Sequence, residues 1–126
     1  MQVTEHFWLE ELDCRDSVPY PEEWIVTRAK PLCEILEKIR SAVGEPIHIL
    51  SGYRTPEHNK LVGGKPKSQH VEGRAVDIAV KTLTPKQLYA KIVQLIDKKV
   101  IPDGGLACGP SFVHYDNRGR KARWTY

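Results

Sequence analysis

The sequence predicts an α+β fold: a small, mainly antiparallel sheet flanked by helices. Helical and strand-like patterns occur in separate blocks and do not alternate strictly, which is typical of this class. The chain has 126 residues, too few for two ordinary domains. No linker, internal repeat or low-complexity stretch divides it. We therefore expect residues 1–126 to form one domain.

The first third of the chain predicts a turn-rich segment followed by helix. Apolar residues recur at helical spacings between Glu22 and Val43. Pro31 interrupts this stretch and predicts either two helices or a kink, because proline lacks an amide proton. Gly44 is suited to end the helix. In the preceding segment we expect three aromatic residues to pack onto the core: Phe7, Trp8 and Tyr20.

Two strands and a loop are predicted in the middle of the chain. Residues 47–50 predict a short strand, and residues 75–80 predict a mostly apolar and therefore central one. Between them, residues 58–73 are rich in glycine, lysine and polar side chains and predict a long loop. Long loops in compact domains are usually either functional or disordered.

The last third predicts a helix followed by short strands. Thr84-Pro85-Lys86-Gln87 combines an N-cap threonine, a proline at the first helical position and a glutamine at the third, so a helix is predicted from there to about Lys99. Short strands are predicted near residues 106–108 and 112–116. Residues 122–125 are predicted to return as a last strand after a hairpin-like turn at Arg-Gly-Arg.

Composition and charge exclude several classes of protein. The formal net charge is +3 and no basic run is present, so nucleic-acid binding is not expected. The odd, widely spaced set of cysteines does not fit a disulfide framework or a cysteine-rich zinc site. We expect small buried roles for these residues: Cys14, Cys33 and Cys108.

The same features bear on location. No apolar stretch approaches membrane-spanning length, and the acidic N-terminal segment lacks the apolar core of a secretory signal. We expect a monomer made in the cytoplasm. If its target is the cell wall, it must reach the wall by release or export.

The segment from Ser68 to Asp77 carries the strongest chemical pattern. His70 at the end of a loop and Asp77 on the following strand can face one metal, and the glycine between them allows a tight turn. This pair alone is too common to indicate a metal site. His114 offers a third ligand and shares a strand face with Asp116, since alternate strand residues point the same way. Two histidines and one carboxylate leave a tetrahedral position open for water, as in catalytic zinc sites.

The pattern Ser-x-His-x-x-Gly-x-Ala-x-Asp at residues 68–77 is preceded by Ser-Gly-Tyr-Arg at 51–54 and followed by Phe-x-His-x-Asp at 112–116. Together these blocks resemble the zinc D-Ala-D-Ala carboxypeptidases and peptidoglycan endopeptidases of the peptidase M15 type. That family includes vancomycin-resistance dipeptidases and several phage endolysins, and it shares its fold with the hedgehog signalling domain. The resemblance runs from about His6 to Trp124 and is closest to the small single-domain subgroup.

The resemblance implies a set of site residues. Arg54 would meet the carbonyl or carboxylate oxygens of the substrate, and the planar donor fork of arginine suits that role. Ser68 and Gln69 would lie at the rim of the site. The implied zinc ligands are His70, Asp77 and His114.

One departure from the family concerns the general base. Many relatives carry an acidic residue three positions before the last histidine, or a histidine two before it, where this chain has Ser111 and Phe112. Asp116 is the nearest acidic residue. It is either the base or a group that orients the metal-binding His114. Glu72 is a reserve candidate that we expect to face solvent.

The function that the resemblance implies is zinc-dependent hydrolysis of amide bonds in peptidoglycan stem peptides, by a carboxypeptidase or an endopeptidase. An alternative is a non-catalytic, zinc-containing binding module of the same fold, which the missing acidic residue before His114 keeps open. A structural zinc domain is less well supported, because only three ligands are apparent. The loop beside the site is mildly basic, because it contains Lys60, Lys65 and Lys67. These lysines are either simply solvated or attract acidic peptides.

Other polar and aromatic residues have simpler expected roles. We expect His6 to pack or lie at the surface, His48 to be structural and His58 to be a solvated loop residue. Asn59 is expected to fix its loop by side-chain hydrogen bonds. Trp124 is expected to pack in the core or at the rim.

Overall fold

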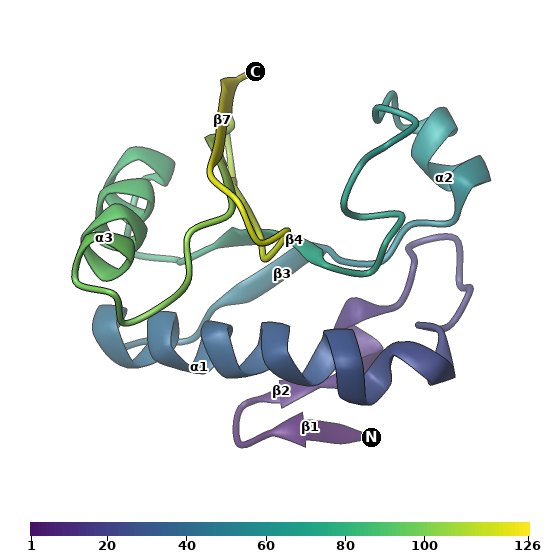
Figure 1. Cartoon of the computed structure of the whole chain (residues 1–126), viewed down its shortest axis with the longest axis horizontal. Coiled ribbons are helices and arrows are strands. Elements are labelled where there is room, and N and C mark those ends of the chain that lie inside the picture. Colours follow the sequence, from purple (N-terminus) through teal and green to yellow (C-terminus); the bar gives the residue numbers. More distant parts are fainter.

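The computed structural model describes residues 1–126 and has the predicted α+β class (Figure 1). Its main sheet has five strands in the order β3-β4-β6-β5-β7, and all neighbours are antiparallel except β5 and β7. The strands are β3 (His48–Ser51), β4 (Ala75–Ala79), β5 (Gly105–Cys108), β6 (Val113–Asp116) and β7 (Ala122–Thr125). None of the helices is long and apolar enough to cross a membrane.

The N-terminal segment forms structure that its sequence did not predict. β1 (Gln2–Thr4) and β2 (Phe7–Trp8) pair as a small antiparallel hairpin, and a 3-10 helix follows at Leu9–Leu12. Phe7 and Tyr20 are buried as predicted. The prediction for Trp8 was wrong: its side chain is half exposed, because adjacent strand residues point to opposite faces and Phe7 takes the inner one.

The predicted helical region is divided near Pro31, as expected. A short 3-10 helix (Glu22–Trp24) and a π-helical turn (Ile25–Ala29) lead into α1 (Lys30–Val43), whose first turn holds the proline. At that position the missing amide proton costs no intrahelical hydrogen bond. Gly44 ends α1 with a φ of 76° and donates its N–H to the carbonyl of Arg40 at 2.8 Å.

The amphipathic face of α1 supplies much of the core. Its buried residues are Leu32, Cys33, Ile35, Leu36 and Ile39. In Figure 1, α1 runs between the main sheet and the N-terminal hairpin. α3 (Pro85–Asp97) packs beside α1 and begins with the predicted capping box of Thr84 and Gln87. α3 contacts β5 and β6, and both helices contribute side chains to the same core cluster as β4 and β6.

The strand β4 is central, as its apolar sequence predicted. It lies between β3 and β6, and four of its five residues are buried. Its register places Asp77 beside Ser51 of β3 on one side and His114 of β6 on the other. The pairing therefore brings a carboxylate and an imidazole from distant parts of the sequence to adjacent positions.

Two predicted connections differ from the structure. Residues 58–73 are not a loop throughout, because α2 (Pro56–Leu61) begins at the N-cap Thr55, whose hydroxyl accepts the N–H of His58. The turn before β7 does not make a hairpin with β6. Both edges of β6 are already paired with β4 and β5, so β7 adds in parallel to the free edge of β5.

Candidate metal centre

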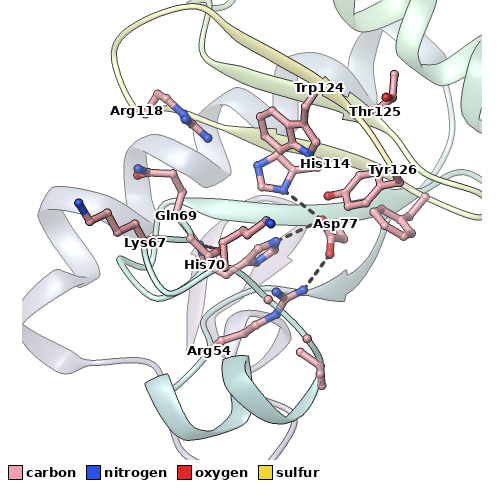
Figure 2. A pocket seen from close by; sticks show the side chains of 16 residues that line it. Arg54, Lys67, Gln69, His70, Asp77, His114, Arg118, Trp124, Thr125 and Tyr126 are labelled. Atoms are coloured by element: carbon pink, nitrogen blue, oxygen red, sulfur yellow. Dashed lines mark hydrogen bonds and ion pairs between the residues drawn. The ribbon is translucent and has the colours of Figure 1, made fainter.

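The three predicted ligands converge at one point. His70, Asp77 and His114 each offer a ligand atom within 4.8 Å of the other two, and all three residues are buried. His70 Nε2 lies 3.2 Å from Asp77 Oδ1, and His114 Nδ1 lies 3.3 Å from the same oxygen (Figure 2). This grouping has the size and the donor types of a single-ion site.

The turn between His70 and Asp77 is fixed by Gly73. This residue has a φ of 69°, as its place in the pattern predicted, and the hydroxyl of Tyr20 donates to its carbonyl at 2.6 Å. A Cβ at this position would lie 2.8 Å from Trp24 and from the Tyr20 hydroxyl. Glycine is required both for the backbone angle and for the close approach of these rings.

In each histidine, one ring nitrogen faces Asp77 and the other makes the contact that fixes the orientation of the ring. His70 Nδ1 lies 2.7 Å from the carbonyl of Gly52, which can only accept, so Nδ1 carries the proton and Nε2 is free. His114 Nε2 lies 2.7 Å from the carboxylate of Asp116, which leaves Nδ1 free. His114 Nδ1 is buried and makes no hydrogen bond in the protein.

A buried imidazole nitrogen without a partner is unfavourable unless something else binds it. The free atoms of both histidines face the carboxylate of Asp77, and outer hydrogen bonds to a carbonyl and a carboxylate are those that metal-binding histidines usually make. The residues present therefore fit a metal ion.

Electrostatics also prepare the site for a cation. Burial disfavours the charge on Asp77, but its contacts with His114 and His70 hold the pKa of its carboxyl well below the usual value. Burial lowers the pKa of His70. Burial also acts to lower the pKa of His114, but its contacts with Asp116 and Asp77 outweigh this effect and raise it. A carboxylate and a neutral imidazole are the forms that bind metal, so a metal ion competes with a proton at His114.

Asp116 lies behind His114, on the side away from Asp77. It is fully buried and accepts hydrogen bonds from His114, from the Gly105 amide at 3.0 Å and from Arg118. Arg118 Nε and Nη2 each donate at 2.8 Å, one to each carboxylate oxygen. Burial opposes its ionisation, but Arg118 and His114 keep the pKa of Asp116 below its usual value. Both oxygens are thus engaged on the outer side of His114.

Arg54 lies on the opposite side of the site, in the loop after β3. Its Nη2 donates to Asp77 Oδ2 at 3.2 Å, its Nη1 to Asn59 Oδ1 at 3.3 Å, and its Nε to Ser51 Oγ at 3.1 Å. Its backbone N–H donates to the carbonyl of His70 at 3.0 Å. Arg54 is thus held against the ligands from both its backbone and its side chain.

Asn59 supports the loop, as its position predicted. It is buried, and its Nδ2 donates to the carbonyl of Lys65 at 2.7 Å while its oxygen accepts from Arg54. The loop that carries the basic residues is therefore tied directly to the arginine of the site.

The ligands open into a cleft of about 770 Å³ (Figure 2). Ser68 and Gln69 line it, and Ser68 Oγ also accepts the backbone N–H of His70 at 3.2 Å. Lys65 and Lys67 line it as well, whereas Lys60 does not. Glu72 lies outside the cleft: it is exposed and contacts Arg28.

The cleft also contains residues to which the sequence assigned no part in the chemistry, among them Arg118 and Tyr126, together with Trp124, which was expected in the core or at the rim. Trp124 and Tyr126 line it, and the Trp124 ring meets the His114 ring edge-on with centroids 4.8 Å apart. Arg118 lines it while holding Asp116. Alternation along the last strand places residues 124 and 126 on one face, but only the pairing of β7 with β5 shows which face that is.

The other histidines lie outside the cleft. His6 is at the surface and its Nδ1 lies 2.7 Å from Glu37, in agreement with the surface interpretation. His48 is exposed on β3. His58 lies in α2, so its assignment to a loop was wrong. The cysteines are all free, and Cys108 is only partly buried where full burial was predicted.

Comparison with known families gives one match of direct relevance. The family model described as Peptidase M15 matches residues 5–116, which include Arg54 and the three candidate ligands. Peptidases of this family depend on a metal, in agreement with the donor set at the floor of the cleft. Comparison with curated protein sequences finds no match.

Proposed function

Since the chain belongs to the peptidase M15 family, we propose that it is a zinc-dependent enzyme that hydrolyses amide bonds in peptidoglycan stem peptides. The observation that carries the proposal is the convergence of His70, Asp77 and His114 at the floor of an open cleft, with His114 Nδ1 buried and unpartnered.

Zinc is the ion that this donor set suits best. Two imidazole nitrogens and one carboxylate, with one position left for water, form the usual catalytic zinc arrangement. When bound, such an ion lowers the pKa of a water molecule and polarises the scissile carbonyl. The two histidines are held in the required tautomers by Gly52 and Asp116.

Arg54 is proposed to hold the substrate. Its guanidinium lines the cleft beside Asp77, and Asn59 and Ser51 fix its plane. From this position it can bind a terminal carboxylate or the oxygen on which charge develops during hydrolysis. Ser68 and Gln69 are proposed to contact the peptide at the rim of the same cleft.

The charge of the cleft supports an anionic substrate. Lys65, Lys67 and Arg118 line it together with Arg54, and Asp77 is its only acidic residue. Stem peptides carry carboxylates, so the basic lining favours their approach. We propose that the enzyme acts as a monomer at the cell wall after release or export, either on a terminal D-Ala or on an internal bond.

For Asp116, the geometry favours orientation of His114 over proton transfer. Its oxygens are engaged by His114, Arg118 and Gly105, and it does not line the cleft. A general base must come within hydrogen-bond reach of the proton that it removes. Because Asp77 is the only acidic side chain in the cleft, the non-catalytic binding module remains the second candidate.

One experiment separates the two functions. Purified protein is incubated with purified peptidoglycan, with and without a chelator, and the fragments are identified by mass spectrometry. If the protein is a zinc peptidase, the wild-type protein should release defined peptide fragments. These fragments should be absent when chelator is added or when the His70→Ala variant is used. Zinc-dependent binding of peptidoglycan without any fragments would instead support the binding module. The masses also identify the bond that is cut.

A further inference from the structure

A second group of metal-binding side chains lies away from the cleft. Cys14 and Asp16, in the turn after the first 3-10 helix, meet His58 of α2, and one ligand atom from each lies within 4.8 Å of the others. Cys14 is buried, His58 is half-buried and Asp16 is exposed. None of the three lines the cleft, so the group is separate from the proposed active site.

Hydrogen bonds already hold the side chains of Cys14 and Asp16 and the backbone of His58 in place. The Thr55 amide donates to Cys14 Sγ at 3.4 Å, and the Thr55 hydroxyl donates to Asp16 Oδ2 at 2.9 Å. The same hydroxyl accepts the N–H of His58 at 3.1 Å. Val18 donates to Asp16 Oδ1 at 3.1 Å and accepts from the Cys14 amide at 2.9 Å. The site therefore needs little rearrangement to bind an ion.

The charge around the group also suits a cation. No lysine or arginine forms an ion pair with Asp16, in contrast with Asp103 and Asp116, which are paired with arginines. The sulfur, carboxylate and imidazole thus face one another without a basic side chain to balance them.

We propose that Cys14, Asp16 and His58 form a second metal site, for Zn²⁺ or a divalent ion of similar softness. Thiolate, imidazole and carboxylate are the ligand types of such ions, and solvent would complete the coordination. As the metal–sulfur bond forms, the S–H bond breaks and the thiol proton passes to solvent. The bound ion ties the turn that holds Cys14 and Asp16 to α2.

The position of this site gives it a structural consequence. Tyr53 donates its N–H to the Leu12 carbonyl at 2.9 Å, and Thr55 contacts both Cys14 and Asp16, so the residues on either side of Arg54 are fixed to the turn. An ion at the second site would hold the backbone of Arg54 against His70. Any consequence for peptidase activity would act through Arg54 and therefore rests on the proposed function. The binding of metal at the second site does not rest on it.

Cobalt titration of metal-free protein tests the proposal. Thiolate ligation gives a near-ultraviolet charge-transfer absorption, which the sulfur-free set of His70, Asp77 and His114 cannot produce. The wild-type protein should bind a second equivalent of Co²⁺ and develop this band. His70→Ala should lose the first site and keep the band. Cys14→Ser should lose the band and the second equivalent, whereas Cys108→Ser should keep both.

A second pair of variants covers the case in which Cys14→Ser fails to fold. His58→Ala should weaken Co²⁺ binding at the second site, while His48→Ala, an exposed histidine on β3, should leave it unchanged. A wild-type protein without the band, or a band of full strength in Cys14→Ser or His58→Ala, would overturn the proposal. Because the readout is an absorption band, its failure is distinct from a lack of peptidase activity.

Discussion

Replacing Asp116 with asparagine tests how the site holds its metal. Every polar contact of the carboxylate comes from a donor: the Gly105 N–H, the Arg118 N–H and Arg118 Nε face Oδ1, and His114 and Arg118 Nη2 face Oδ2. An asparagine must point its NH₂ group toward one of these two groups of donors in either orientation. At least one donor loses its acceptor in either orientation. When the NH₂ group faces His114, the imidazole can accept from it only by moving its own proton from Nε2 to Nδ1.

The second outcome places a proton on the nitrogen that would bind the metal. We therefore expect Asp116→Asn to weaken metal affinity by about 10–100-fold, the usual effect of removing the partner of a metal-binding histidine. At about 1.4 kcal/mol per factor of ten, this corresponds to about 1.4–2.8 kcal/mol. Turnover by the fully metal-loaded variant should stay close to that of the wild-type protein.

Competition with a chromophoric chelator measures the affinity, and peptide hydrolysis at saturating metal measures the turnover. Asp97→Asn, at the exposed end of α3, is the matched control and should change neither. If Asp116 is instead the general base, affinity will be normal and turnover will fall by about 10²–10⁴-fold. That result would refute the orienting role inferred from the geometry. Normal values for both quantities would exclude both roles.

Three other substitutions test the rest of the site. Arg54→Lys should keep the metal but lower kcat/KM by about 10²–10³-fold. The reason is that lysine cannot replace the planar guanidinium, which contacts three side chains. An unchanged kcat/KM would show that Arg54 has a structural role only. Trp124→Ala removes an aromatic contact with His114 worth about 0.5–1.5 kcal/mol, so chelator competition should show metal affinity lower by up to about tenfold. Lys67→Ala should raise KM for acidic stem peptides at low salt and have little effect at high salt, whereas Lys60→Ala, outside the cleft, should not.

The part of the site that could be predicted from the sequence rests on short-range geometry. His70 and Asp77 are joined by a turn whose glycine has the expected positive φ. Alternation along residues 112–116 placed His114 and Asp116 on one face of the strand, with Tyr115 in the core. The pattern did not show which side of His114 Asp116 occupies. Only the contacts with Arg118 and Gly105 place it on the outer side.

The features that could not be predicted depend on long-range pairing. β1 and β2 have three and two residues, too few to show a periodic pattern. A hairpin-like turn was expected before β7, which would pair β7 with the preceding strand β6. Both edges of β6 are already paired with β4 and β5, so that pairing does not form. The parallel pairing of β7 with β5 brings Trp124 to the cleft, and no local rule encodes it. The meeting of Cys14 with His58 likewise depends on the packing of the N-terminal turn against α2.

Gly52 connects the fold of the N-terminal segment to the chemistry of the site. Its carbonyl fixes the tautomer of His70, and a Cβ on Gly52 would lie 2.9 Å from the Cα and 3.0 Å from the carbonyl oxygen of Leu12. The next residue, Tyr53, donates its N–H to the same carbonyl, and Arg54 follows directly. The N-terminal segment therefore packs against the backbone that orients one ligand and carries the proposed substrate-binding arginine. Because that packing tolerates no side chain at Gly52, a displacement of the segment near Leu12 would reach His70 and Arg54 together.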